Sequence, residues 1–90
     1  DDPHRLAIVL LLLRDGPCTQ VKIQQKLAQN YGIWLAQPTI AYHQRLLIAA
    51  GLIEYTSSKQ YRYFYCARPE MIEWFLADIE HADREGSDAQ

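Results

Sequence analysis

One face of a predicted helix over residues 38–50 carries side chains that could contact nucleic acid. Ile40 and Leu47 define the buried side of this helix at about 100° per residue, so Tyr42 and Arg45 lie on the opposite side. An arginine can bind a phosphate or a guanine edge, and a tyrosine can contact a phosphate or a thymine methyl group. With the helix start and a predicted wing added, the expected DNA-contacting residues are Gln37, Pro38, Thr39, Ala41, Tyr42, Arg45, Lys59 and Arg62.

Histidines and carboxylates are the other groups that could do chemistry. A tight zinc site needs three or four converging ligands, whereas His4, His43 and His81 are predicted on three different helices. The chain has no glycine-rich phosphate loop, no nucleophile motif and no Glu/His pair at metalloprotease spacing. We therefore predict no metal site, no cofactor and no enzymatic activity.

Two helices are predicted to open the chain. Asp2 is a favoured cap for a helix that starts at Pro3 and is stopped by Gly16-Pro17. Thr19 is the predicted cap of a second helix, which runs to about Gln29. The apolar stripe of the first helix is expected at Leu6, Val9, Leu10 and Leu13, widened by Ile8 and Leu12, and that of the second at Ile23 and Leu27.

A third helix and a hairpin follow. The helix is predicted over Pro38–Ala50, with Gln37 as its cap and Gly51 ending it in a left-handed conformation. Strands are predicted over Leu52–Thr56 and Gln60–Ala67, with a turn at 57–59. A lone hairpin is marginal in water, so one of its faces should pack on the helices. This order predicts a winged helix-turn-helix, a mainly α fold with a small β-hairpin (α+β).

The closing helix, which is predicted to begin at Pro69, is apolar on more sides than the surface of a small monomer allows. Either it is buried by its own chain, or, as we favour, it packs on a second copy. The predicted dimer contacts are Leu6, Met71, Trp74, Phe75, Asp78 and Ile79. Residues 1–82 are expected to form one DNA-binding and dimerisation domain, and 83–90 a flexible polar tail.

The net charge of −2 averages two unlike parts of the 90-residue chain. Residues 3–68 hold eight Lys/Arg and two acidic residues, whereas residues 69–90 hold seven acidic residues and one base. Local patches rather than totals set the field that a phosphate backbone experiences. The first part of the chain is therefore the better candidate for a nucleic-acid partner.

Composition argues against several other classes of protein. The longest apolar run, Leu6–Leu13, is far shorter than the roughly 20 residues of a membrane-spanning helix. No signal-peptide pattern is present, and two cysteines cannot form a disulfide scaffold. We therefore expect a cytoplasmic protein without a membrane partner. Because the chain starts at Asp1 rather than Met, elements upstream are expected to be missing.

Two segments resemble the arsenic-repressor (ArsR/SmtB) family of winged-helix regulators. The segment 2–8, DPHRLAI, is similar to the family's "DPxRLxI" opening, and 38–44, PTIAYHQ, followed by 50–53, AGLI, resembles its recognition-helix pattern "STVSxHLxxLxxAGLV". The resemblance covers about residues 2–82. It implies a homodimeric transcriptional repressor that a bound signal releases from DNA, with a dimer built from the terminal helices.

The sequence departs from this family's pattern at its metal-binding positions and in one turn. The family's metal-binding thiols would fall at Thr19 and Val21, and the positions of its zinc ligands on the last helix carry no matching set. Gly32–Gln37 is longer than the family's turn, which leaves PadR-, MarR- and GntR-like winged helices open as relatives. Within this turn Trp34 is expected to fill core space, or else to line a ligand pocket.

Cys18 and Cys66 are a possible redox pair, because some metal-free members of the resembled family switch by thiol oxidation. A bridge between them requires α-carbons within about 7 Å. The alternative, which we favour, is that both cysteines behave as small apolar side chains.

The function predicted from the sequence is a sequence-specific DNA-binding transcriptional regulator, a homodimeric repressor that answers to an unknown small-molecule or redox effector. The alternative is a winged-helix module that contacts only proteins. It would leave the third helix and the wing neutral, and it remains open because Arg45 is the only charged residue on that helix.

Overall fold

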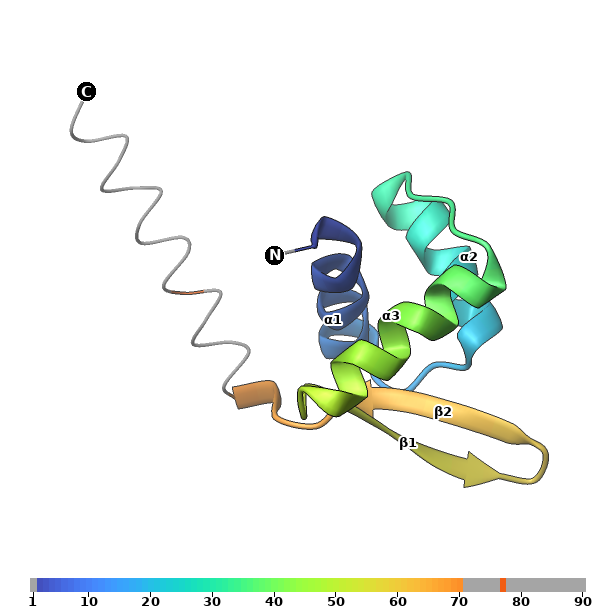
Figure 1. Cartoon of the computed structure of the whole chain (residues 1–90), viewed down its shortest axis with the longest axis vertical. Coiled ribbons are helices and arrows are strands. Elements are labelled where there is room, and N and C mark those ends of the chain that lie inside the picture. The colour runs from blue at the N-terminus through green and yellow to red at the C-terminus, as the bar shows by residue number, and fades with distance from the viewer. Residues whose placement is uncertain (1, 71–76, 78–90) are drawn as a thin grey trace.

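The computed structural model describes residues 2–70 and residue 77. Three helices, α1 (Pro3–Asp15), α2 (Gln20–Tyr31) and α3 (Gln37–Ala49), precede the strands β1 (Ile53–Ser58) and β2 (Tyr61–Cys66). The helices pack together, and the hairpin extends beneath α3 with its turn away from α1 (Figure 1). This is the predicted winged helix-turn-helix. The described part of the chain contains no helix long and apolar enough to cross a membrane.

Local signals set the helix ends largely as predicted. The Asp2 carboxylate accepts hydrogen bonds from the backbone N–H groups of His4 (2.8 Å) and Arg5 (3.4 Å), and the Thr19 hydroxyl accepts one from that of Lys22 (3.2 Å). Gly16 ends α1 with a φ of 81°, a conformation that suits a residue without a β-carbon. The cap of α3 differs from the prediction, because Ala36 holds that position and makes no side-chain bond, while Gln37 is already helical.

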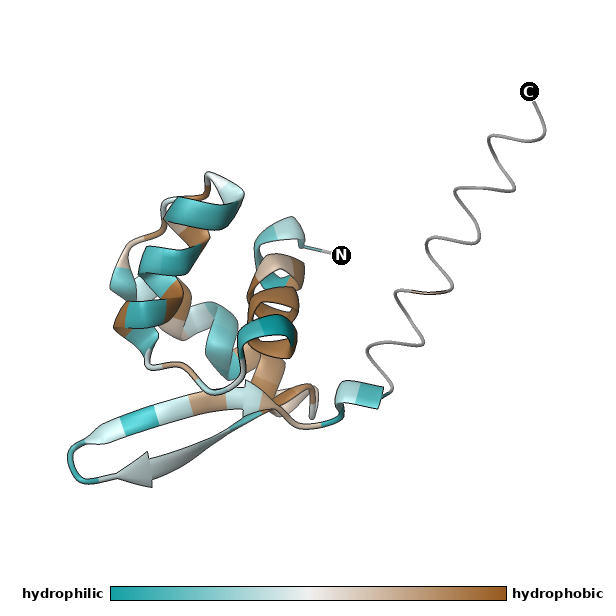
Figure 2. Ribbon diagram, turned by 180° about the vertical axis from the view of Figure 1, so that it is seen from behind, coloured by the Kyte–Doolittle hydropathy of each residue, from teal (hydrophilic) through white to brown (hydrophobic). Residues whose placement is uncertain are grey.

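The core lies where α1 meets α2, α3 and β2. Its fully buried large side chains are Ile8, Leu11, Leu12, Ile23, Leu27, Ile40 and Ile53. The predicted stripe of α1 is wrong in part, since Ala7, Ile8, Val9, Leu11 and Leu12 are buried while Leu6 is 39% exposed. In Figure 2, α1 is the most continuously apolar element, and neighbouring elements rather than its own pattern decide which side faces inward.

The wing is longer at its tip than predicted. Ser57 and Ser58 continue the ladder opposite Arg62 and Tyr61, so the turn lies at residues 59–60 instead of 57–59. Lys59 adopts a left-handed conformation there, with a φ of 58°. The inward strand face carries Phe64, which is buried, and Cys66, which is half-buried.

A single residue before α2 ties the wing to the helices. The backbone of Cys18 exchanges two hydrogen bonds with that of Phe64, at 2.9 and 2.8 Å. This bridge adds one rung to the two-stranded sheet and fixes β2 against the start of α2. As a result the wing and the helix-turn-helix flank a common cleft.

Candidate nucleic-acid interface

A cleft of about 440 Å³ opens between the start of α2, one side of α3 and the wing. The start of α2 contributes Thr19, Gln20 and Val21, and α3 contributes Ala41, Gln44, Arg45 and Ile48. The wing closes the third side with Tyr55, Gln60, Tyr61, Arg62 and Phe64. Among the residues that the structure describes, the lining includes two arginines and no acidic residue.

The two arginines reach the cleft from different elements. Arg45 is exposed on α3 and has no ion-pair partner in the described ranges 2–70 and 77. The Arg62 guanidinium stacks 4.8 Å above the ring of Tyr55, which in turn packs against Phe64 at 5.7 Å. Arg62 is therefore positioned by the wing, and no acidic side chain among the described residues forms an ion pair with it. Two cations on either side of one cleft favour an anionic occupant.

Gln44 supplies an uncommitted hydrogen-bond donor. It is only 3% exposed, and its Nε2 has no hydrogen-bond partner among the described residues. A buried donor without an acceptor costs about 1–3 kcal/mol. The first N–H groups of α2, at Gln20 and Val21, also lie beside the cleft and have no intrahelical acceptors. A phosphate oxygen could accept from the first N–H groups of α2 directly, and from Gln44 once its side chain turns toward the cleft.

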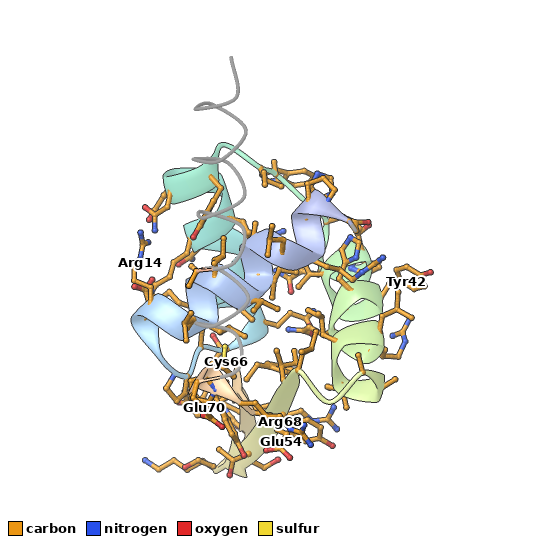
Figure 3. The ribbon with its side chains drawn as sticks, turned by 90° about the vertical axis from the view of Figure 1, so that its left-hand side faces the viewer. Arg14, Tyr42, Glu54, Cys66, Arg68 and Glu70 are labelled. Carbon is orange, nitrogen blue, oxygen red and sulfur yellow. The ribbon has the colours of Figure 1, made fainter. Side chains whose placement is uncertain are left out.

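Only part of the predicted DNA-contacting set lines this cleft. Pro38, Thr39 and Tyr42 are exposed along α3, and the labelled Tyr42 side chain points away from the body of the protein in Figure 3. Lys59 is exposed at the tip of the wing. Ala41 and Arg62 line the cleft itself. The structure thus brings Ala41, Arg45 and Arg62 together in the cleft, whereas the exposed Pro38, Thr39, Tyr42 and Lys59 lie outside its lining.

Gln37 occupies a different environment from its predicted neighbours. Its amide accepts a hydrogen bond from Gln20 Nε2 (2.7 Å) and donates one to Gln24 Oε1 (2.7 Å), while Gln24 Nε2 donates to the Leu35 carbonyl (2.8 Å). This chain of amides fixes the start of α3 against α2. Sequence reasoning missed it, because no local pattern shows which glutamines meet across two helices.

Trp34 does not fill core space. Its side chain is 71% exposed, and it is not part of the cleft lining. Its neighbours Ile33 and Leu35 pack against the core instead. Because three apolar residues stand in a row in this turn, the backbone can direct only some of them inward.

The predicted dimer contacts are described only in part. Leu6 is exposed on α1, and Leu10, one turn later on the same side, is half-buried. Met71, Trp74, Phe75, Asp78 and Ile79 lie outside the described residues. The expected polar tail, 83–90, also lies outside them.

The two cysteines are free thiols with separate hydrogen-bond acceptors. Cys18 Sγ donates to the Gly16 carbonyl and Cys66 Sγ to the Val9 carbonyl, each at 3.4 Å. Cys18 pairs with Phe64, so Cys66 is its diagonal neighbour two residues along β2. Diagonal α-carbons lie about 7–8 Å apart, at or beyond the limit for a disulfide. Burial raises the pKa of the Cys66 thiol, which further disfavours the reactive thiolate.

The histidines do not all stand apart as predicted. His4 and His43 belong to different helices, but their rings meet edge to face with centroids 6.0 Å apart. His43 is buried, and this burial lowers its pKa. The neutral imidazole is therefore the favoured form of His43 near neutral pH.

The structure resembles those of several solved transcription regulators. The winged helix-turn-helix DNA-binding domain of a possible ArsR-family regulator from Mycobacterium bovis, described as homodimeric, superposes with a TM-score of 0.74 at 20% identity over 93% of this chain and 71% of that one. A MarR family regulator from Neisseria meningitidis gives 0.66 at 23% identity, over 99% of this chain and 59% of that one. The structure of Bacillus subtilis PadR in complex with operator DNA superposes with a TM-score of 0.64 at 18% identity, over 80% of this chain and 46% of that one.

These likenesses establish the fold. The chain spans less than two thirds of the length of the Neisseria and Bacillus structures. No protein-family model matches the sequence, and no curated protein matches it.

Proposed function

We propose that this protein is a DNA-binding transcriptional regulator that holds the duplex between α3 and the wing. The observation that carries the proposal is the cleft, where Arg45 and Arg62 flank Gln44 Nε2, a donor without a hydrogen-bond partner among the described residues. None of the described residues that line the cleft is acidic. In a winged helix-turn-helix the second helix of the motif enters the major groove. In this arrangement the cleft receives a backbone phosphate, and the exposed side of α3 faces the bases.

The solved structures add support from similarity of fold. The Bacillus structure is described as a complex with operator DNA and the Mycobacterium structure as a DNA-binding domain. By analogy we propose a repressor of the ArsR-like type, which acts in the cytoplasm and has no enzymatic activity.

Titration of a fluorescently labelled mixed-sequence duplex, followed by anisotropy at two salt concentrations, tests this function. Binding should weaken steeply with salt, because each phosphate contact contributes a slope of about −0.9 in log K against log salt. Absence of binding at low salt, with the fold intact by circular dichroism, would contradict the proposal. The protein-only winged helix would then be the better account.

We further propose that the protein acts as a homodimer. The support is the apolar side of α1 with exposed Leu6 and half-buried Leu10, and the apolar sequence of residues 71–79. A dimer would present two copies of α3 to successive major grooves, as paired half-sites require. The structurally similar domain from Mycobacterium bovis is described as homodimeric.

Leu6→Lys is expected to shift the protein from dimer to monomer, because it buries an unpaired ammonium in an apolar contact. Light scattering at tens of micromolar protein measures the shift. Leu46→Lys is the matched control, since Leu46 has the same 39% exposure but lies on α3. A dimer that survives Leu6→Lys, or a wild-type monomer, would contradict this interface.

A further inference from the structure

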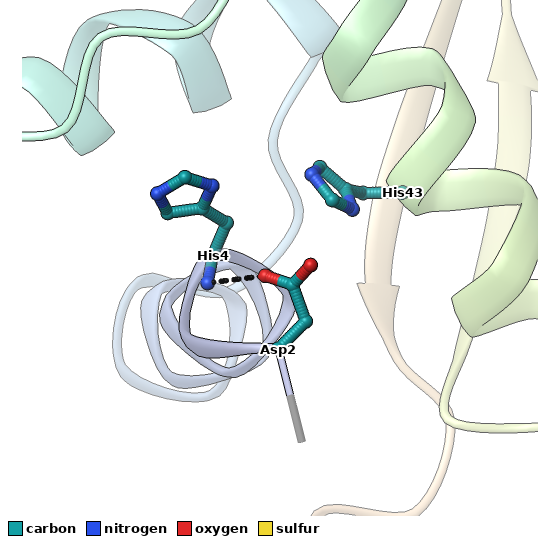
Figure 4. A group of neighbouring side chains, drawn as sticks. All are labelled: Asp2, His4 and His43. Atoms are coloured by element: carbon teal, nitrogen blue, oxygen red, sulfur yellow. Dashed lines mark hydrogen bonds between the residues drawn. The ribbon is translucent and has the colours of Figure 1, made fainter.

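Three side chains with metal-binding atoms meet where the start of α1 faces the middle of α3. Asp2, His4 and His43 each offer one ligand atom, and these atoms all lie within 4.8 Å of one another (Figure 4). Asp2 and His4 are half-buried and His43 is buried. The site lies away from the cleft, whose lining includes none of these residues.

Two imidazoles and one carboxylate are a donor set that binds zinc in sites with an open fourth position. Tetrahedral bonds of about 2.0–2.1 Å place neighbouring donors roughly 3.3 Å apart. The three side chains therefore need to approach one another by at most about 1.5 Å, which rotation about side-chain bonds can provide.

The capping role of Asp2 is compatible with coordination. Its Oδ1 accepts the backbone bonds from His4 and Arg5 that begin α1. Its Oδ2 lies 3.5 Å from Arg5 NH1. One oxygen can thus keep the helix cap while the other binds a cation.

A positive group already stands in this place. Arg5 NH1 lies 3.3 Å from His43 Nδ1 as well as 3.5 Å from Asp2 Oδ2. A guanidinium has only donors, so Nδ1 of His43 must present its lone pair to the site. The side chain of Arg5 is 30% exposed and can turn outward into water.

We propose that Asp2, His4 and His43 form a binding site for a divalent transition-metal ion of the zinc type, which replaces the guanidinium of Arg5. The ion would join the first residues of α1 to α3, whose own start has no side-chain cap. It would thereby stabilise the pairing of these two helices. This inference does not depend on DNA binding, and its test contains no DNA.

Titration of the full chain with Co²⁺, read from its visible absorption, and with Zn²⁺ in competition with a chromophoric chelator tests the site. We expect one ion per chain. His4→Gln and His43→Gln should each lower the affinity at least tenfold, because each removes one of three protein ligands. Asp2→Asn should also weaken binding while it keeps the helix cap, since asparagine caps as well as aspartate. His81→Gln is the matched control and should bind as the wild type does.

Arg5→Gln distinguishes a metal site most sharply from a cluster of side chains that only supports the fold. It removes the competing charge and should raise the metal affinity severalfold, whereas loss of structure would lower it. Zn²⁺ should also raise the melting temperature of the wild type but not that of His43→Gln or His4→Gln.

No uptake by the wild type at about 100 μM metal would overturn the proposal. Equal uptake by the wild type and both histidine variants would overturn it as well. Uptake by Arg5→Gln alone would mean that Arg5 closes the site in the natural chain, and would also contradict the proposal.

Discussion

Replacing Arg45 by alanine is expected to weaken duplex binding while the fold stays intact. Arg45 is exposed on α3, lines the cleft and has no ion-pair partner among the described residues. If it reads a base edge, the substitution should cost about 1–3 kcal/mol and relax the preference for one sequence. If it binds a phosphate, affinity should fall more uniformly across sequences, and the slope of log K against log salt should become shallower by about 0.9.

Anisotropy titrations of wild type and Arg45→Ala at two salt concentrations measure both effects. Arg14→Ala is the matched control, because Arg14 pairs with Asp15 at 3.2 Å and lies on the opposite side of the molecule from Tyr42 (Figure 3). It should leave the affinity nearly unchanged. Unchanged binding in both Arg45→Ala and Tyr42→Ala would contradict the assignment of α3 as the recognition helix.

Leu11→Ala is expected to lower the free energy of unfolding by about 2–5 kcal/mol. Leu11 is fully buried on α1, the helix that contacts α2, α3 and β2 at once. Its truncation removes apolar contacts and leaves a cavity. Because α2, α3 and β2 all border this cavity, they cannot all shift to fill it. A loss of this size is a large part of the roughly 5–15 kcal/mol that stabilises a typical domain.

Urea unfolding followed by circular dichroism measures the change as a lower midpoint. Leu46→Ala, which truncates a 39% exposed leucine of α3, should cost well under half as much. Equal destabilisation by the two substitutions would mean that α1 is not the centre of the core.

Local chemistry predicted most of the helix ends. Asp2 with Pro3, Thr19 and Gly16 each act through their own backbone or a bond within three residues, so the sequence alone contains the signal. The buried side of α1 could not be predicted in the same way. Residues 6–13 are apolar throughout, so periodicity selects no side, and contacts with α2, α3 and β2 decide it.

The candidate interface was predictable where it depends on helical periodicity. Ile40 and Leu47 are buried as expected, which places Tyr42 and Arg45 on the exposed side. The cleft as such was not predictable, because it depends on the Cys18–Phe64 bridge that brings the wing to α2. Gln44 could have drawn attention, since a glutamine between two buried aliphatic positions of one helix has to find a partner.

The approach of Asp2, His4 and His43 also lies beyond sequence reasoning. Asp2 and His4 belong to the start of α1. His43 contacts the Arg5 guanidinium and lies 38 residues beyond Arg5 in the sequence. Only the packing of α1 on α3 brings them together. Placement on separate helices is therefore a weak argument against a shared site.

The most direct test of the central claim is a two-dimensional amide spectrum of the ¹⁵N-labelled protein, recorded during titration with a short duplex. We expect the largest shifts at α3, the wing and the start of α2, and a downfield shift of the Gln44 side-chain amide as it gains an acceptor. Signals of the end of α2 and of the exposed side of α1 should move little. Shifts confined to those two regions, with Gln44 and Arg45 unmoved, would contradict the account.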